Sequence, residues 1–320
     1  MSSTKSTSLL ARLSRSIEIR MLGLALVLGL ILSLASEYFL TTNNLLNLLD
    51  QSVVIGVVAV GMTFVILTGG IDLSVGSVAG FTGIILGLAM REMPIPAALL
   101  LAIACGALIG LLAGVLVAVF GLAPFVVTLG MMAICRSLAY VISGQQSISD
   151  VPESLGRLVD SSTLGVPMNV VILIACYAVA WVYLTWAKGG RTIYAIGSNI
   201  EAARIAGLAA TRYRILVYVI CSALSTLSVA LIAGQLLSID PLAGNGMELD
   251  AIAAVVIGGA SLFGGRGSVI GTLMGVFIMV MIRNGMNLLG ISPFWQGTAI
   301  GSIIIGAVLI ERLMARRTTR

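Results

Sequence analysis

The sequence predicts an all-α protein that crosses a membrane many times, with about ten transmembrane helices. The chain is 59% hydrophobic and only 10% charged, whereas a soluble domain carries about 25% charged residues. Its mean hydropathy of +1.12 does not fit a water-soluble surface. The apolar residues are also grouped into runs whose length approaches the ~20 residues that a helix needs to cross the bilayer core.

The apolar runs follow one another along the whole chain, and each is taken as one predicted span. They cover approximately residues 21–37, 52–69, 73–90, 97–119, 124–142, 168–187, 214–236, 250–263, 268–288 and 295–311. The eighth run is short, and glycine pairs at 258–259 and 264–265 interrupt or end it, so some spans are expected to be short or broken. A signal peptide over the first run is the alternative. It would leave nine spans and place the two chain ends on opposite sides.

The distribution of basic residues favours the arrangement with ten spans. If the N-terminus is cytoplasmic, 14 of the 18 lysines and arginines lie on the cytoplasmic side, as the positive-inside rule requires. Both termini are therefore predicted to be cytoplasmic. The basic residues act as topology determinants in this interpretation, and no nucleic-acid partner is expected.

This topology divides the chain into a single transmembrane domain with two tails and two long loops. The tails are cytoplasmic and cover residues 1–20 and 312–320, and the transmembrane domain covers residues 21–311. The loop at 143–167 is acidic and predicted to be external, whereas the loop at 188–213 is basic and predicted to be cytoplasmic.

Two hexapeptides repeat a weak pattern, Ile71-Asp72-Leu73-Ser74-Val75-Gly76 and Ile239-Asp240-Pro241-Leu242-Ala243-Gly244. Each follows a predicted span, and the topology places them on opposite sides of the membrane. This relation is consistent with an inverted repeat.

The residue types exclude most catalytic chemistry. The chain has no histidine, so histidine-dependent triads and histidine-based zinc sites are absent. Its two lysines, Lys5 and Lys188, do not follow a phosphate-binding glycine-rich loop. We therefore expect no enzyme activity, no catalytic or metal-binding residues and no cofactor in this chain. If ATP supplies the energy, another polypeptide binds it.

The basic loop contains a predicted short helix. Asn199 can cap a helix over 200–206, and Gly207 can close it. Glu201 lies in its first turn, where the helix dipole favours negative charge. From the residues alone, this helix is either a docking element for a partner or an interfacial helix on lipid headgroups.

Four segments resemble the ribose/xylose/arabinose-type ABC permeases, and most closely those of ribose type. They are AVGMTFVILTGGIDLSVGSVAG at 59–80, YAIGSNIEAARIAG at 194–207, ELDAIAAVVIGGASLFGGRGSVIGTLMG at 248–275 and NGMNLLGISPF at 284–294. The similarity runs from about residue 37 to the C-terminus. Ser198 stands where a second glycine is common in the family, and Arg283 stands where asparagine is common.

The resemblance implies a permease subunit that imports a small sugar, a pentose or a hexose, across a bacterial inner membrane. It implies a second permease copy or a paralogue, a periplasmic sugar-binding protein, and a cytoplasmic ABC ATPase that binds ATP and magnesium. Two nucleotide-binding domains are often fused in that ATPase. The family's docking motif maps onto Gly197, Asn199, Glu201, Ala202, Ala203, Arg204 and Gly207.

Six polar residues are candidates for gating or for the translocation path: Asp72, Arg136, Arg283, Asn284, Asn287 and Gln296. Each also has a structural alternative. Asp72 could cap the third span, and Arg136 could extend toward the interface. Arg283 could pair with an acid of the neighbouring loop, Asp240, Glu248 or Asp250. The three amides could join helices. An ion-coupled secondary transporter, which requires ionisable groups within the membrane, is the alternative function.

Overall fold

The structure is a computed structural model that describes residues 17–163 and 166–318. Its helices are α2 (Ile17–Ala35), α3 (Thr42–Leu67), α4 (Val75–Glu92), α5 (Ile95–Ala118), α6 (Pro124–Ser143), α7 (Glu153–Asp160), α8 (Met168–Trp186), α9 (Lys188–Ser198), α10 (Ile200–Ile205), α11 (Ala210–Leu236), α12 (Met247–Ile257), α13 (Val269–Leu288) and α14 (Phe294–Thr318). Strands β1 (Ser162–Thr163) and β2 (Val166–Pro167) form one antiparallel pair. Most of the predicted N-terminal tail lies outside the described residues.

The predicted membrane spans are found as helices, and the structure separates them into three kinds. In the described part of the chain, seven helices are long and apolar enough to cross a membrane, namely α3, α4, α5, α6, α8, α11 and α13. Helices α2 and α14 contain shorter apolar stretches, Ile19–Ala35 and Phe294–Leu309. The eighth predicted span is α12, which has only 11 residues. At 1.5 Å per residue it reaches about half of a 30 Å bilayer core, so ten full crossings is an overestimate.

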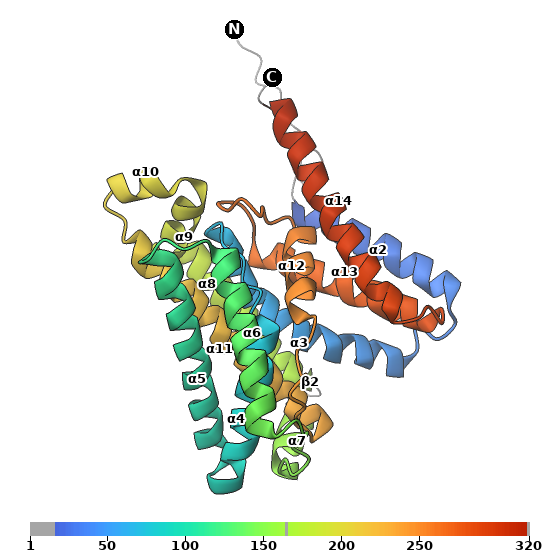
Figure 1. The fold of residues 1–320 in the computed structure, drawn as a ribbon. Coiled ribbons are helices and arrows are strands. Elements are labelled where there is room, and N and C mark those ends of the chain that lie inside the picture. Colours follow the sequence, from blue (N-terminus) through green and yellow to red (C-terminus); the bar gives the residue numbers. More distant parts are fainter. Residues whose placement is uncertain (1–16, 164–165, 319–320) are drawn as a thin grey trace.

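The core is built around α3 and α11, which pack against each other (Figure 1). Helix α5 packs on α11, and α13 packs on α3. The glycine series of α5 makes the first contact close, because a Cβ at Gly110 would collide with the carbonyl oxygen of Tyr218. Within a membrane the hydrophobic effect does not drive helices together, so their association depends on close packing, which glycines allow.

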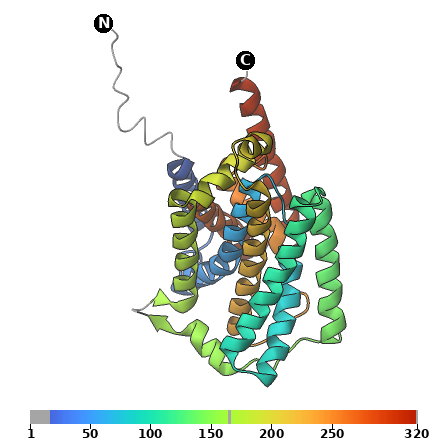
Figure 2. The ribbon, with the colours of Figure 1, turned by 90° about the vertical axis from the view of Figure 1, so that its left-hand side faces the viewer.

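The loops of the bundle formed by α4, α5, α6, α8 and α11 collect at its two ends, whereas the α2–α3 and α13–α14 connections lie at its side (Figures 1 and 2). At one end, the backbone N–H of Gly265 donates to Leu67 O (2.9 Å), and Tyr194 of α9 donates its hydroxyl to Gly267 O (2.9 Å). At the other end, Ile148 and Ile239 form an isolated antiparallel bridge. The basic loop at 188–213 and the acidic loop at 143–167 therefore lie at opposite ends of this bundle.

The two long loops are more structured than the sequence indicates. The acidic loop contains α7 and the β1–β2 pair, and the basic loop contains α9 in addition to the predicted short helix. Helix α9 was missed because it is short and has two glycines in its first turn, although its buried residues Thr192, Ile193 and Ile196 lie on one helical face.

Candidate functional site

A segment of extended and turn conformation enters the protein between α11 and α12. We call residues 238–246 the re-entrant segment. It begins after Leu237, which has a positive φ of 48°, and it descends along α4. Its path follows one face of α4 on which Gly76, Gly80, Gly83 and Gly87 lie.

Each of these glycines leaves room for the segment. A Cβ at Gly87 or Gly83 would contact the side chain of Ile239, and one at Gly80 would meet Pro241 O at 3.0 Å. A Cβ at Gly76 would collide with the carbonyl oxygen of Gly244. The distance from Gly87 to Gly76 along the helix is about 16 Å, so the segment reaches deep into the helical bundle.

Gly76 and Gly244 meet in the interior of the protein. They end the two related hexapeptides, which the predicted topology placed on opposite sides of the membrane. In the structure the two glycines touch, since a Cβ on either one would meet the carbonyl oxygen of the other. Both hexapeptides follow a long helix, α3 or α11; the first includes the start of α4, and the second precedes α12. An inverted relation between them stays a prediction.

Arg136 of α6 holds the re-entrant segment by its backbone. Its Nη1 donates to Pro241 O (2.6 Å) and to Ala243 O (3.1 Å). Non-helical backbone at membrane depth must find partners inside the protein, because lipid offers none. The guanidinium therefore supplies donors to two carbonyl groups that the irregular conformation leaves without helical partners.

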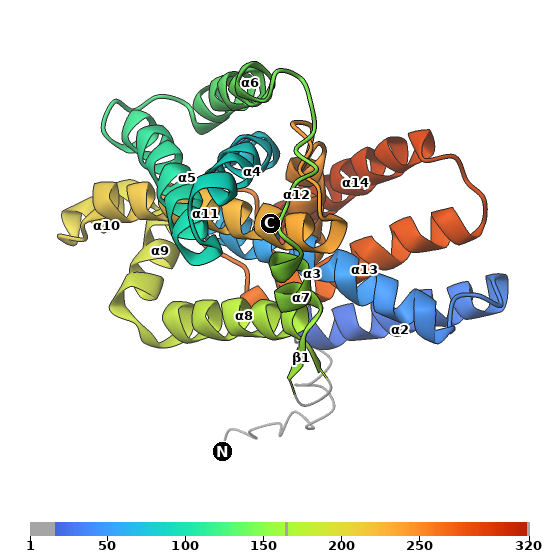
Figure 3. The ribbon, with the colours of Figure 1, turned by 90° about the horizontal axis from the view of Figure 1, so that it is seen from below.

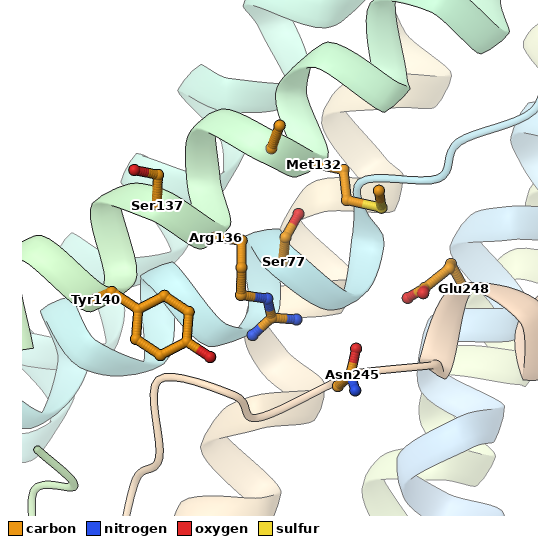
Figure 4. Close-up of a pocket in the computed structure, with 8 residues that line it drawn as sticks. Ser77, Met132, Arg136, Ser137, Tyr140, Asn245 and Glu248 are labelled. Carbon is orange, nitrogen blue, oxygen red and sulfur yellow. The ribbon is translucent and has the colours of Figure 1, made fainter. Parts of the chain in front are cut away.

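A cavity of about 470 Å³ lies beside this arginine. Figure 4 shows Arg136 of α6 directed toward Ser77 of α4, Asn245 of the re-entrant segment and Glu248 of α12. The complete lining consists of Ser77, Met132, Ala133, Arg136, Ser137, Tyr140, Asn245 and Glu248. We call this the α4–α6–α12 pocket. Hydroxyl, amide, carboxylate and guanidinium groups provide both donors and acceptors, which suits a polyhydroxylated solute.

The other predicted path residues lie outside this lining. Asp72 is 1% exposed, and its Oδ1 accepts hydrogen bonds from the backbone N–H (2.9 Å) and the hydroxyl (2.6 Å) of Ser74. Ser74 is the N-cap residue of α4. Asp72 therefore fixes the turn before the helix and does not cap it directly.

The three predicted amides join helices. Asn284 of α13 exchanges two hydrogen bonds with Asn44 of α3 (2.6 and 3.0 Å), and both residues are buried. Gln296 of α14 donates to Asn287 of α13 (2.7 Å). The interhelical alternative thus describes their contacts, and a role in transport stays a prediction.

Arg283 forms an ion pair with Asp250 of α12. Its Nη2 lies 2.7 Å from Asp250 Oδ1, and the two side chains are 29% and 3% exposed. Asp250 is one of the three acids that the sequence offered as its partner. The pair joins α13 to the short helix α12 near the candidate pocket.

This pair yields a prediction. Arg283→Asn is expected to lower the free energy of unfolding by about 3 kcal/mol, because Asp250 would remain buried without its counter-charge. The double variant Asp250→Asn/Arg283→Asn should recover most of that loss in thermal unfolding in detergent. Normal stability of the single variant would contradict the ion-pair role. A double variant with restored stability but altered uptake would assign the Arg283–Asp250 pair to the transport route.

Several lining residues of the pocket were missed from the sequence, above all Ser77, Asn245 and Glu248. Ser77 lies in the recognised segment at 59–80, and Glu248 was considered only as a partner for Arg283. A usable signal was present in α4, whose glycines recur at spacings of four, three and four residues. That spacing marks one helix face along which another backbone can pass.

The predicted docking helix exists as α10. Asn199 is its N-cap, and its side chain accepts from the backbone N–H of Ala202 (3.0 Å). Gly207 follows the helix with a φ of +75°. Gly197 packs against Leu67 O and Gly265 N, so α9 and α10 are seated on the end of α3 and on the loop after α12.

The predicted docking residues differ in accessibility. Glu201 and Arg204 form an exposed ion pair (3.0 Å), and Ala202 is also exposed. Ala203 is only 4% exposed and packs with Ile196 and Ala210. Ala203 therefore positions the helix, and Ala202 is the small residue that faces outward.

Comparison with known proteins decides the family. Residues 44–311 match the family model described as branched-chain amino acid transport system/permease component. The chain belongs to this family. It is a multi-pass membrane component of a transport system and not an enzyme.

Individual relatives are similar over nearly their whole length. The ribose import permease protein RbsC of Bacillus subtilis (strain 168) is 40% identical over 289 residues, which cover 89% of this chain and 90% of the relative. RbsC of Escherichia coli (strain K12) is 41% identical over 294 residues, or 89% and 91% of the two chains. The D-allose transport system permease protein AlsC of E. coli (strain K12) is 34% identical over 295 residues, or 92% and 90%. No solved structure matches.

Proposed function

We propose that this permease translocates a small sugar, a pentose or a hexose, across the inner membrane as part of a binding-protein-dependent ABC importer. The observation that carries the proposal is the similarity to ribose and allose permeases along about nine tenths of both chains. ATP is hydrolysed by a separate cytoplasmic ATPase, in which two nucleotide-binding domains are fused. A periplasmic sugar-binding protein delivers the substrate. A second permease copy or a paralogue completes the membrane unit.

The lining of the α4–α6–α12 pocket offers polar groups that a sugar could use. Arg136, Asn245 and Glu248 give it donors and acceptors, beside apolar surface from Met132 and Ala133. Sugar hydroxyls require such donors and acceptors. In the proposed mechanism the sugar contacts Arg136, Asn245 and Glu248 only transiently, because tight binding would slow its release.

The proposed coupling route starts at α10. Both termini and the α9–α10 loop are placed in the cytoplasm, in agreement with the 14 basic residues predicted on that side. The ATPase docks on exposed Ala202, Glu201 and Arg204. Movement of α9 and α10 is passed to the end of α3 and to the loop after α12 through Gly197. Helix α4 follows the end of α3 and carries Ser77 into the pocket. Helix α12 precedes the loop and carries Glu248 into it.

The function is tested by reconstitution into liposomes with the ATPase and the sugar-binding protein. Uptake of labelled ribose or allose should require ATP and both partners, and labelled leucine should not be transported. The alternative is an ion-coupled secondary transporter, and uptake that follows an imposed proton or sodium gradient without ATP would establish it instead.

The docking proposal makes a separate prediction. Ala202→Lys should reduce copurification of the ATPase at least about ten-fold, because a long charged side chain would stand on the docking face while buried Ala203 still holds the helix. The matched control is Ala97→Lys, an exposed alanine at the opposite end of the molecule. Equal recovery of the ATPase with both variants would exclude docking at Ala202.

A further inference from the structure

A groove with an almost entirely apolar lining runs along α8. Its inner part is a hollow of about 450 Å³, lined from three helices by Val60, Phe64, Ala175, Cys176, Val179, Ala180, Tyr183, Ile220, Ala223 and Leu224. Its outer part is a hollow of about 600 Å³, lined by Ala178, Val179, Val182, Tyr183, Trp186 and Ala187. Because Val179 and Tyr183 line both parts, the two hollows are one continuous surface, which we call the α8 groove.

The groove lies away from the proposed translocation pocket. In the end-on view of Figure 3, α8 runs along one edge of the molecule, and α6 and α14 lie toward the opposite edge. Ile174, Val179 and Trp186 of α8 are exposed apolar side chains, as expected for a helix that faces lipid. From Ala175 to Ala187 the groove spans about 18 Å along the helix, which is comparable to one leaflet of a 30 Å core.

One end of the groove is polar and positively charged. Tyr183 and Trp186 are found there, and such residues prefer the headgroup level of a bilayer. Lys188 directly follows the last groove residue, Ala187, and the backbone N–H of Arg191 donates to Ala187 O (3.4 Å). Both basic side chains are exposed, and neither forms a salt bridge within the part of the chain that the structure describes.

We propose that the α8 groove binds one anionic phospholipid. One acyl chain lies in the hollow between α3, α8 and α11, where alanines leave space beside Phe64 and Tyr183. The phosphate-bearing headgroup pairs with Lys188 and Arg191 at the end where α9 begins. Basic residues beside transmembrane helices on the cytoplasmic side recognise anionic headgroups in this way. The binding does not depend on which solute the permease transports.

The three tryptophans of the chain allow a direct test. The double variant Trp181→Phe/Trp295→Phe retains only Trp186, which lines the groove. In liposomes, phosphatidylglycerol or phosphatidylcholine with brominated acyl chains is added at equal mole fraction, and quenching of Trp186 fluorescence is measured. We expect the groove to bind phosphatidylglycerol more tightly than phosphatidylcholine, by a factor of roughly five in the binding constant for each basic residue. Brominated phosphatidylglycerol should therefore quench Trp186 more strongly. A control that retains only Trp295 of α14 should be quenched equally by both lipids.

Two further variants in the Trp186-only background decide the outcome. Lys188→Gln/Arg191→Gln should abolish the preference for phosphatidylglycerol while quenching by phosphatidylcholine persists. Ala175→Phe/Ala178→Phe should fill the groove and reduce quenching by both lipids, whereas Ala104→Phe, at an exposed alanine of α5, should not.

Equal quenching by both lipids would mean that only unselective boundary lipid covers the groove and would overturn the proposal. So would a preference that survives loss of both basic residues. If neither lipid quenched Trp186, a second protein chain would cover the groove, and the proposal would also be overturned.

Discussion

Replacement of Arg136 with methionine is expected to reduce sugar uptake at least about ten-fold and to destabilise the protein. The carbonyl oxygens of Pro241 and Ala243 would lose the guanidinium that they share. An unsatisfied buried polar group costs about 1–3 kcal/mol, so the two together give a loss of roughly 2–6 kcal/mol. The re-entrant segment would no longer be held against α4, and the α4–α6–α12 pocket would lose one wall.

The measurement combines uptake in proteoliposomes with thermal unfolding in detergent. Arg136→Lys should give an intermediate result, because an ammonium group keeps the charge but lacks the planar fork of donors. The control is Arg157→Met, since Arg157 is an exposed residue of α7. Uptake and stability of Arg136→Met that equal those of the control would show that the two hydrogen bonds do not hold the segment.

Gly76→Ala is expected to have a comparably large effect through packing alone. The added Cβ would collide with the carbonyl oxygen of Gly244 and would lie 2.6 Å from Glu248 Oε2. A backbone carbonyl cannot move aside as the end of a flexible side chain can, so overpacking should cost about 3 kcal/mol or more. We expect a large loss of folded protein in fluorescence-detected size-exclusion chromatography after heating.

Gly130→Ala is the matched control for this substitution. Gly130 also lies within a transmembrane helix, α6, but an added Cβ would meet nothing within 4 Å. Gly83→Ala should fall between the two, since its Cβ would meet the side chains of Val229 (2.9 Å) and Ile239 (3.2 Å), which can shift. If all three variants were equally stable, the contact between α4 and the re-entrant segment would be looser than the structure indicates.

The sequence by itself determined the local features of this protein. The apolar runs located α3, α4, α5, α6, α8, α11 and α13 to within a few residues, apart from the early starts of α3 and α11, because a helix in lipid must satisfy its own backbone and cover its length with apolar side chains. The cap at Asn199 and the stop at Gly207 were also readable, since capping involves only residues within one turn. The recognised segments led to the family, which the family model confirms.

Only the tertiary structure decided where polar groups of distant segments meet. Arg136 and Pro241 are 105 positions apart, and nothing local to either residue indicates that one serves the other. The depth of the re-entrant segment depends on the glycine face of α4, and the contact of Gly76 with Gly244 depends on how α3 and α11 pack. Hydropathy reports whether a segment is buried in lipid or protein, but it carries no information about which buried donor reaches which carbonyl. For that reason the predicted path residues were dispersed by the fold, and the pocket was assembled from residues that no single stretch of sequence brings together.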